Sequence, residues 1–321
     1  MASPSSVVVA VVLPAYNEEL TIEKTICAFH AVLPSAAIWV VNNCSNDATE
    51  SLARNTLLAL DCPGGVLNES RKGKGHAVRR AFLEIDADIY VLADADMTYP
   101  AECAQDLMAP VIDGVADMVV GDRHSAGHYA AENKRALHGF GNRLVRSLVN
   151  RLFNAELSDI MSGYRVFSRC FVKGYPILVE GFEIETDMTL HALDKRFRIV
   201  EIPVEYRDRQ EGSVSKLNTF RDGAKVLFVI MQILRYYKPL VFFGGMSLLS
   251  GLAGLCAAIP VVQDWIDFRY IYHVPLAILA TGLEIVAVMA LGIGMTLDSI
   301  VYQQRREYER HLLNNISMSA R

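Results

Sequence analysis

Cysteine is scarce in this 321-residue chain, which has six, and none of them is arranged for cross-linking or metal binding. No C-x-x-C pair occurs, and no Cys/His cluster has the spacing of a zinc site. The scattered cysteines therefore predict reduced thiols and exclude a disulfide-stapled scaffold. The chain also lacks an excess of charge of either sign, because 31 basic side chains stand against 36 acidic ones, a formal net charge of −5. Nucleic-acid binding normally requires a basic excess, so nucleic acid is excluded as a partner.

Long apolar runs are confined to the C-terminal third of the chain. Residues 239–262 carry no charged side chain, and residues 273–297 carry one, Glu284. At ~1.5 Å per residue, either run crosses the roughly 30 Å hydrocarbon core of a bilayer as a helix. Basic residues flank the outer ends of the pair, whereas Arg269 is the one basic residue of the connecting loop, so the positive-inside rule places both termini in the cytoplasm. We therefore expect an integral membrane protein with two spans, a cytoplasmic tail at 301–321 and the lipid bilayer as a partner.

An amphipathic pattern precedes the first run, at residues 216–238. It is typical of a helix that lies on the inner leaflet or docks on the soluble part of the chain. Within the runs, Ser250 and Gly254 are small residues four apart, which permits close helix packing and leaves a homo-oligomer open. Glu284 is costly in hydrocarbon, so we expect it to face a partner helix or another subunit.

The first 215 residues alternate between apolar runs and helical patterns. The runs consist mainly of Val, Ile, Leu and Ala, as do strands that are buried on both faces of a parallel sheet. Their alternation with helices predicts an α/β domain, a Rossmann-like and mostly parallel sheet with helices on both faces. The predicted strands are residues 7–13, 38–41, 89–93 and 118–121, and the predicted helices are residues 18–33, 47–60, 75–85 and 101–112.

Polar motifs follow three of the predicted strands: P-A-Y-N-E-E at 14–19, N-N-C-S-N-D at 42–47 and D-A-D at 94–96. Ligands of open parallel sheets bind beyond the carboxyl ends of the strands, so we expect the three motifs to share one crevice. Asp94 and Asp96, two apart on an extended segment, would point the same way. They could hold one hard divalent cation, Mg²⁺ or Mn²⁺, whose other ligands come from substrate phosphates. The alternative is a pair of solvated surface carboxylates.

A basic loop, R-K-G-K-G at residues 71–75, precedes a predicted helix. The N–H groups at a helix N-terminus favour an anion, and glycines allow the backbone to approach it closely, so the loop is a candidate for binding a diphosphate. It does not match the Walker pattern G-x-x-x-x-G-K-[ST]. A solvated basic loop is the alternative.

Together these motifs resemble the family 2 glycosyltransferases of the GT-A fold. Three later motifs are similar to the polyprenyl-phosphate glycosyltransferases, a group that includes dolichyl-phosphate mannose synthase and the bactoprenol glucosyltransferases. They are D-I-M-S-G-Y-R at 159–165, G-F-E-I-E at 181–185 and R-Q-E-G-S-V-S-K-L at 209–217. The resemblance covers nearly the whole chain. We expect a cytoplasmic GT-A domain at 1–215, a juxtamembrane segment at 216–238, two transmembrane helices within 239–300 and a tail at 301–321.

The resemblance implies inverting transfer of a sugar from a UDP- or GDP-sugar to a polyprenyl phosphate, giving a lipid-linked sugar for cell-envelope glycans or protein glycosylation. Matching positions assign donor binding to Pro14, Ala15, Tyr16, Glu18, Asn43, Asp47, Lys74, Asp94, Ala95 and Asp96, and acceptor-phosphate binding to Arg123, Arg135, Arg209, Ser215 and Lys216. The family often has two acidic residues where this chain has Asn42 and Asn43. Because asparagine can donate as well as accept hydrogen bonds, the base stays open between uracil and guanine.

Asp94, Asp96 and Asp159 are the catalytic candidates. A metal ion on the first two would neutralise the leaving diphosphate. The second pKa of a phosphate monoester is near ~6, so the acceptor is largely anionic at neutral pH and needs no strong base. Asp159 is therefore a candidate base or positioning carboxylate, with capping of the turn at Ser162 as the alternative. Glu185 is a secondary candidate.

Two other functions are alternatives to this one. Q-I-L-R-Y at 232–236 superficially resembles the Q-x-x-R-W signature of processive polysaccharide synthases, but two spans are too few for a polymer channel. A catalytically silent membrane scaffold would be expected to have lost Asp94, Asp96 or Lys216, and all three are present. The sequence does not name the sugar. We expect undecaprenyl phosphate in a bacterial inner membrane as the acceptor, with dolichyl phosphate as the alternative.

Overall fold

The computed structural model describes residues 7–124, 136–179, 183–207 and 230–319. The chain divides into two compact units, Met1–Leu217 and Asn218–Arg321. The first unit is an α/β domain built on one sheet, and the second contains two long helices.

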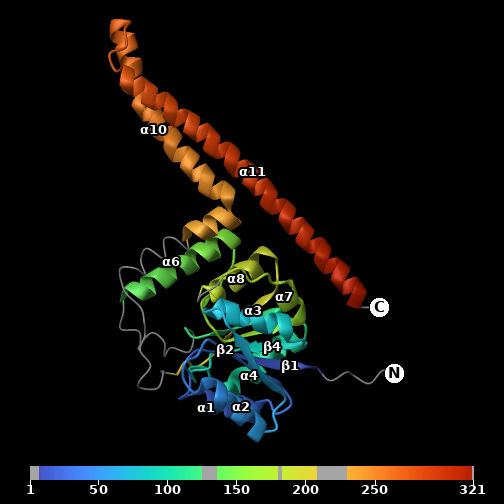
Figure 1. The fold of residues 1–321 in the computed structure, drawn as a ribbon. Helices are drawn as coiled ribbons and strands as arrows, with labels where there is room; N and C mark the ends of the chain where they lie inside the picture. Colours follow the sequence, from blue (N-terminus) through green and yellow to red (C-terminus); the bar gives the residue numbers. More distant parts are fainter. Residues whose placement is uncertain (1–6, 125–135, 180–182, 208–229, 320–321) are drawn as a thin grey trace. The chain divides into compact units, whose positions relative to one another are not determined.

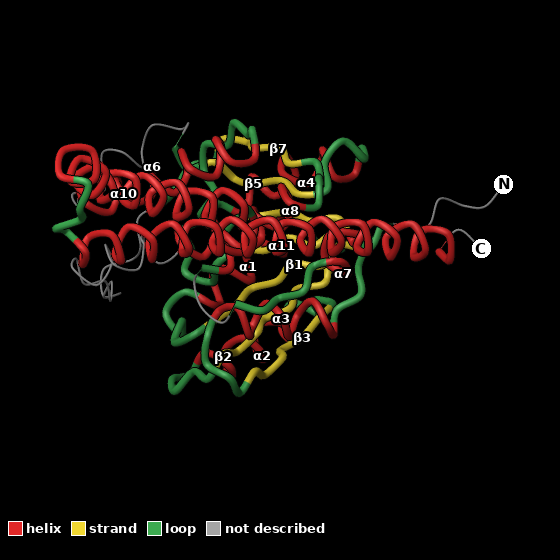
Figure 2. Tube along the Cα trace, turned by 90° about the horizontal axis from the view of Figure 1, so that it is seen from above, coloured by secondary structure: helices red, strands yellow, loops and turns green. Residues whose placement is uncertain are grey.

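The strands of the first unit are β1 (Val9–Ala15), β2 (Ala37–Asn43), β3 (Gly64–Glu69), β4 (Ile89–Leu92), β5 (Met118–Asp122), β6 (Arg165–Ser168) and β7 (Ile199–Pro203). Its helices are α1 (Ile22–Val32), α2 (Thr49–Ala59), α3 (Lys74–Glu84), α4 (Ala104–Ile112), α6 (Ala136–Phe153), α7 (Arg169–Gly174) and α8 (Ile184–Asp194), and a 3₁₀ turn at Ala101–Cys103 precedes α4. The strands form one sheet in the order β3-β2-β1-β4-β6-β5-β7. Figure 2 shows this order, from β2 and β3 on one side to β5 and β7 on the other.

One strand of the sheet, β6, runs against its neighbours. It pairs antiparallel with β4 on one side and with β5 on the other, and the remaining pairs are parallel. Arg165, the first residue of β6, lies opposite both Leu92 near the end of β4 and Val120 in β5. The segment that leads into β6 therefore reaches the same sheet edge at which β4 and β5 end.

Two hydrophobic layers enclose the sheet, because successive side chains of a strand point to opposite faces. Val11 and Leu13 of β1 pack in one layer with α1, α2 and α4. Ala10 and Val12 pack in the other with α3, α7 and α8. Figure 1 shows the two helix groups on opposite sides of the sheet. The predicted fold class, a mostly parallel sheet covered by helices on both faces, is confirmed.

The four predicted strands are present, and each of their bounds lies within two residues of the predicted one. The β3, β6 and β7 strands were not predicted. The first of these begins with Gly64 and Gly65 and ends with Asn68 and Glu69, so it lacks the continuous apolar run that marks a buried strand.

The second unit contains α10 (Pro239–Phe268) and α11 (Val274–Ser319), both long and apolar enough to cross a membrane. The two helices pack together through small residues. The Ser250 hydroxyl donates to the Leu283 carbonyl at 2.8 Å, and a Cβ added to Gly254 would lie 2.7 Å from a carboxyl oxygen of Glu284. Glu284 thus faces the partner helix of its own hairpin. The α11 helix continues past residue 297, the predicted end of the second span.

The predicted juxtamembrane segment is described only in its last part. Residues 230–237 are helical, and residues 216–229 lie outside the described residues.

A buried histidine in the first unit makes its stability sensitive to pH. His191 of α8 is 6% exposed and packs against the rings of Phe171, Tyr175 and Phe197. Burial, with a smaller contribution from Lys195, lowers the pKa of His191 to about 4. The unfolded chain takes up this proton near pH ~6.5, whereas the folded chain takes it up only near pH 4. As the pH is lowered from about 6.5 to about 4, the free energy of unfolding therefore decreases. Above pH ~6.5 the full stability is present.

We expect the variant His191→Gln to lose this pH dependence. At pH 8 the variant is less stable than the wild type because it packs less well, and the difference narrows by up to about 3 kcal/mol as the pH falls to 4. Urea unfolding of the detergent-solubilised chain, followed by the fluorescence of Trp39 in β2, measures this difference. A difference that stays constant from pH 8 to pH 4 would contradict the assignment.

Candidate active site

The carboxyl ends of four strands and the loop before β6 meet at one edge of the sheet. The β1, β2 and β4 strands are mutually parallel, and β4 and β5 share the antiparallel neighbour β6. The residues that follow these strands are the polar motifs of the sequence, so three of the predicted motifs do share an edge. The segment 159–164 joins them because β6 starts there.

A buried lysine joins two carboxylates at this edge. Lys74, the first residue of α3, lies with its Nζ 2.5 Å from Asp94 Oδ1 and 2.6 Å from Glu185 Oε1. The side chains of Lys74 and Glu185 are each 8% exposed, whereas that of Asp94 is 28% exposed. Burial by itself would lower the pKa of Lys74, but the two carboxylates outweigh it and raise that pKa above its usual range, so the ammonium stays charged. Asp94 is therefore the solvent-facing end of a charged triad.

Gly163 forms the wall beside this triad. A Cβ at this position would lie 2.8 Å from Asp94 Oδ2 and 3.1 Å from Lys74 Nζ, closer than a carbon atom can approach without displacing them. The Gly163 N–H donates to the Tyr99 hydroxyl at 2.9 Å, and the Tyr164 hydroxyl donates to the Pro100 carbonyl at 3.1 Å. Burial raises the pKa of Tyr99, so this phenol stays neutral. These contacts hold the segment before β6 against the loop after β4.

Asp96 has a different environment from Asp94. It is 6% exposed, and its Oδ1 accepts hydrogen bonds from the Thr98 hydroxyl at 2.5 Å and the Thr98 N–H at 3.2 Å. Within the described ranges, no group of three or more His, Cys, Asp or Glu side chains could hold a metal ion. Two carboxylates from one loop fit an ion such as Mg²⁺, which is bound by one or two carboxylates and completes its shell with water and phosphate oxygens.

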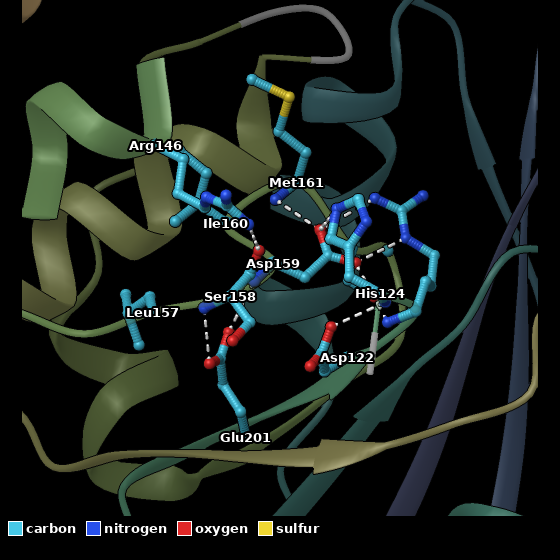
Figure 3. Close-up of polar contacts among 12 residues, drawn as sticks. Asp122, His124, Arg146, Leu157, Ser158, Asp159, Ile160, Met161 and Glu201 are labelled. Carbon is cyan, nitrogen blue, oxygen red and sulfur yellow. Dashed lines mark hydrogen bonds and ion pairs between the residues drawn. The ribbon is translucent and has the colours of Figure 1, made fainter. Parts of the chain in front are cut away.

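A second ion pair lies at the end of β5, and Figure 3 shows its carboxylate, Asp159, beside Asp122 and His124. Arg123 donates from Nε to Asp159 Oδ2 at 2.7 Å and from Nη2 to Asp159 Oδ1 at 2.9 Å, a bidentate arrangement. Oδ1 also accepts the Met161 N–H at 3.2 Å, and His124 Nε2 lies 4.0 Å from it. Burial would raise the pKa of Asp159, but hydrogen bonds and the charge of Arg123 outweigh it and lower the pKa. Asp159 is thus ionised, and both of its carboxylate oxygens bind Arg123.

The exposed member differs between the two ion pairs. In the first, the anion Asp94 is 28% exposed and its cation is buried; in the second, Asp159 is 1% exposed and Arg123 is 11% exposed. Arg123 also lies over the Tyr206 ring, 5.6 Å from its centroid. One sheet edge therefore presents a partly exposed carboxylate, Asp94, and a guanidinium, Arg123, that its buried carboxylate partner holds in one orientation.

A fully buried arginine fixes the loop between these two places. Arg165 donates to the carbonyls of Ser162 at 2.8 Å and Ile160 at 2.9 Å, and to the Thr189 hydroxyl of α8 at 2.9 Å. Burial lowers the pKa of Arg165 below its ordinary value. The loop before β6 is therefore held by neutral acceptors as well as by ion pairs.

The motif after β1 faces the motif after β2. The Glu18 N–H donates to the Thr49 hydroxyl at 2.8 Å, and the Glu19 N–H donates to Asp47 Oδ2 at 3.2 Å. Pro14 and Ala15 end β1, and Tyr16 follows directly with its side chain partly exposed. The Asp47 carboxylate also accepts from Thr49, so it shapes the start of α2.

Asn43 holds the basic loop in place. Its amide donates to the Arg71 carbonyl and its Oδ1 accepts the Gly73 N–H, both at 2.7 Å. An aspartate here could accept from Gly73 but could not donate to Arg71, which gives a physical reason for the amide. The basic residues of the loop differ in their partners: Arg71 pairs with Glu69, and the Lys72 ammonium lies 3.0 Å from the Tyr16 hydroxyl.

The structure brings most of the predicted site residues to this edge, with Lys74 bound to Asp94 and Asp159 bound to Arg123. Arg135, Arg209, Ser215 and Lys216 lie outside the described residues. Glu185 was only a secondary candidate, and Tyr99 and Gly163 were not predicted as site residues. The S-G-Y-R motif contains Gly163, so a signal for that residue was present in the sequence.

Known proteins resemble the chain in sequence and in fold. A family model described as "Glycosyl transferase family 2" matches residues 10–175. The glycosyltransferase AglJ of Haloferax volcanii is 29% identical over 96% of this chain and 98% of its own length. A dolichyl-phosphate hexose transferase of the same organism is 28% identical over 70% of this chain and 92% of its own.

Among solved structures, the glucosyl-3-phosphoglycerate synthase of Mycobacterium tuberculosis, in complex with Mn²⁺, uridine diphosphate and phosphoglyceric acid, superposes with a TM-score of 0.56. It is 22% identical, and the match covers 72% of this chain and 78% of that one. This likeness concerns the fold, and it confirms the predicted GT-A architecture.

Removing the cation of the buried triad is expected to destabilise the first unit. Lys74→Met leaves the carboxylates of Asp94 and Glu185 side by side without their cation, and we expect the free energy of unfolding at pH 7 to fall by about 3 kcal/mol. Urea unfolding measures the change. The matched control is Arg54→Met, which breaks an exposed pair with Glu50 and should cost at most about 0.5 kcal/mol. Equal losses in the two variants would contradict the view that the triad stabilises the site.

Proposed function

The chain belongs to glycosyl transferase family 2, and on that premise we propose that it moves a sugar from a nucleotide-sugar donor to a polyprenyl phosphate in the membrane, with inversion at the anomeric carbon. The printed name of the dolichyl-phosphate hexose transferase supports a lipid phosphate as the acceptor. The two membrane-length helices support the same choice, because they would hold the protein in the bilayer that contains such a lipid. The observation that carries the proposal is that one sheet edge presents a partly exposed carboxylate just after β4, Asp94, and an oriented guanidinium just after β5, Arg123.

The chemistry of the acceptor explains why such an edge is needed. An oxygen of the acceptor phosphate forms a bond to the anomeric carbon, and the bond from that carbon to the donor diphosphate breaks. A phosphate monoester is largely dianionic at neutral pH, because its second pKa is near ~6. The reaction therefore needs no strong base, but a negative acceptor must approach a negative donor. Stabilising and orienting the two anions is the main task of the site.

We assign the acceptor phosphate to Arg123, whose planar guanidinium matches phosphate oxygens. Asp159 acts as a positioning residue in this scheme. It is buried, its pKa is lowered, and both of its oxygens are bound to Arg123, so it is a poor proton acceptor. The proposal thus chooses between the two roles that the sequence left open for Asp159. Arg135, Arg209, Ser215 and Lys216 are proposed to join Arg123 at the acceptor.

Asp94 and Asp96 are the residues that would hold Mg²⁺ or Mn²⁺, since two carboxylates with a solvent-facing member fit an ion that shares its shell with phosphates. When bound, such an ion neutralises the diphosphate as it leaves. The solved synthase of similar fold contains Mn²⁺ together with uridine diphosphate, which supports a divalent ion. Lys74 holds the Asp94 carboxylate in place from its buried side.

The nucleoside is proposed to lie along the ends of β1 and β2. Pro14, Ala15, Tyr16, Glu18 and Asp47 line this part of the edge in the proposal, and Ala95 lies between the two metal ligands. Asn43 contributes indirectly, because its amide is used to hold the backbone of the basic loop.

The membrane arrangement is also part of the proposal. We infer a cytoplasmic catalytic domain at 1–215, a juxtamembrane segment at 216–238, spans within 239–300 and a cytoplasmic tail at 301–321. Basic residues at both outer ends of the hairpin support this orientation, among them Lys238 and Arg305. The inner membrane of a bacterium and undecaprenyl phosphate remain the expected setting and acceptor.

A transfer assay tests the proposal. Purified full-length protein in detergent is given a polyprenyl phosphate, Mn²⁺ and one labelled UDP- or GDP-sugar at a time, and label is counted in the organic extract. We expect one donor to label the lipid, EDTA to abolish the labelling, and Asp96→Asn to lower it at least about 100-fold because the ion loses a ligand. Asp106→Asn, at an exposed position on α4, is the matched control and should retain the activity.

Two outcomes would overturn the proposal. Release of free nucleotide with no labelled lipid from any donor would refute the acceptor, and growth of a water-soluble polymer would favour a processive synthase.

A further inference from the structure

Glu201 supports the Arg123–Asp159 pair from the neighbouring strand. It lies in β7, where its Oε2 accepts the Ser158 N–H at 2.7 Å and its Oε1 accepts the Asp159 N–H at 2.8 Å (Figure 3). One carboxylate thus binds two successive backbone amides, directly before the side chain that holds Arg123. The sequence offers no local signal for this role, because Glu201 is 42 residues from Asp159.

Strand pairing brings the parts of this arrangement together. The β7 strand is parallel to β5, with Glu201 opposite Val120. Arg123 follows the end of β5, so the cation and the carboxylate that supports its partner come from adjacent strands. On its other side, the segment 157–159 is held by α6: Arg146 donates to the Ser158 carbonyl at 3.1 Å, and Asn150 exchanges two hydrogen bonds with Leu157. The backbone of Asp159 is therefore fixed from two elements.

The negative charge of Glu201 contributes to its contact with the two backbone amides, as does the shape of its carboxylate. Burial raises the pKa of Glu201, while the two amide hydrogen bonds oppose that shift by favouring the anion. A carboxylate accepts at both oxygens, whereas a glutamine side chain would offer one acceptor and turn an NH₂ group toward the second amide. Glu201 also borders an open hollow of about 360 Å³, which Leu157 and Phe197 line as well.

We propose that Glu201 is a positioning residue for the acceptor phosphate, acting by fixing Asp159 so that Arg123 keeps the orientation that binds the anion. This inference rests on the proposed function, since it concerns the acceptor side of that reaction. It assigns no contact with the substrate to Glu201. Its effect is expected to be confined to the acceptor, because the donor is proposed to bind at the ends of β1, β2 and β4.

Glu201→Gln in the full-length protein tests this role. We expect KM for the polyprenyl phosphate to rise about tenfold, the size of one lost hydrogen bond to a charged group, with KM for the nucleotide sugar unchanged. Glu201→Asp keeps both oxygens on a shorter stem and should give an intermediate acceptor KM. The matched control is Asp117→Asn. Asp117 bonds the backbone and side chain of Arg198 at the opposite end of the same strand pair, so it should affect stability without changing the acceptor KM.

A double-variant cycle separates positioning from general support of the fold. If Glu201 acts through Asp159, the variant Asp159→Asn/Glu201→Gln has the acceptor KM of Asp159→Asn alone. Independent, multiplying effects, or a donor KM that rises as much as the acceptor KM, would overturn the inference. So would an unchanged acceptor KM in Glu201→Gln. Each of these results requires a wild-type protein that labels the lipid; failure of the wild type with every donor refutes the proposed function instead.

Discussion

The reversed strand β6 is the constraint on which the rest of the site depends. Because it runs antiparallel between β4 and β5, the loop that leads into it arrives at the edge where those two strands end. That loop supplies Gly163 to the Asp94 side and Asp159 to the Arg123 side. A parallel strand at this place in the sheet would deliver the loop to the opposite edge, and neither contact could form.

The two ion pairs give this edge a division of charge. In each pair the better-buried member holds the more exposed one, so an oriented anion and an oriented cation are presented without the cost of ordering them when substrates arrive. The buried charges of these two pairs are tolerated because each has a charged partner, as with Lys74 and its two carboxylates. Such an arrangement suits a reaction in which two anions must meet, and it explains why no free carboxylate base is required.

The sequence predicts those parts of the structure that depend on residues close together in the chain. Continuous apolar runs mark β1, β2, β4 and β5, and polar motifs directly after three of them locate the edge. The strands β3, β6 and β7 could not be predicted in this way, because they are short or lack a continuous apolar run. Partners from distant segments could not be predicted either: Lys74 and Glu185 are 111 residues apart, and only the sheet order brings them together. The amide of Asn43 is explained by its two backbone contacts, which no pattern of residue types reveals.

In the proposed reaction, Arg123 binds the acceptor phosphate through a guanidinium whose orientation is set by Asp159. The most direct test is the acceptor KM of Arg123→Lys, which keeps the positive charge but loses the fork that Asp159 holds. We expect an acceptor KM raised about tenfold or more, with the donor KM and the thermal midpoint close to those of the wild type. A wild-type acceptor KM in this variant would show that charge alone suffices there, and would refute the role assigned to the Arg123–Asp159 pair.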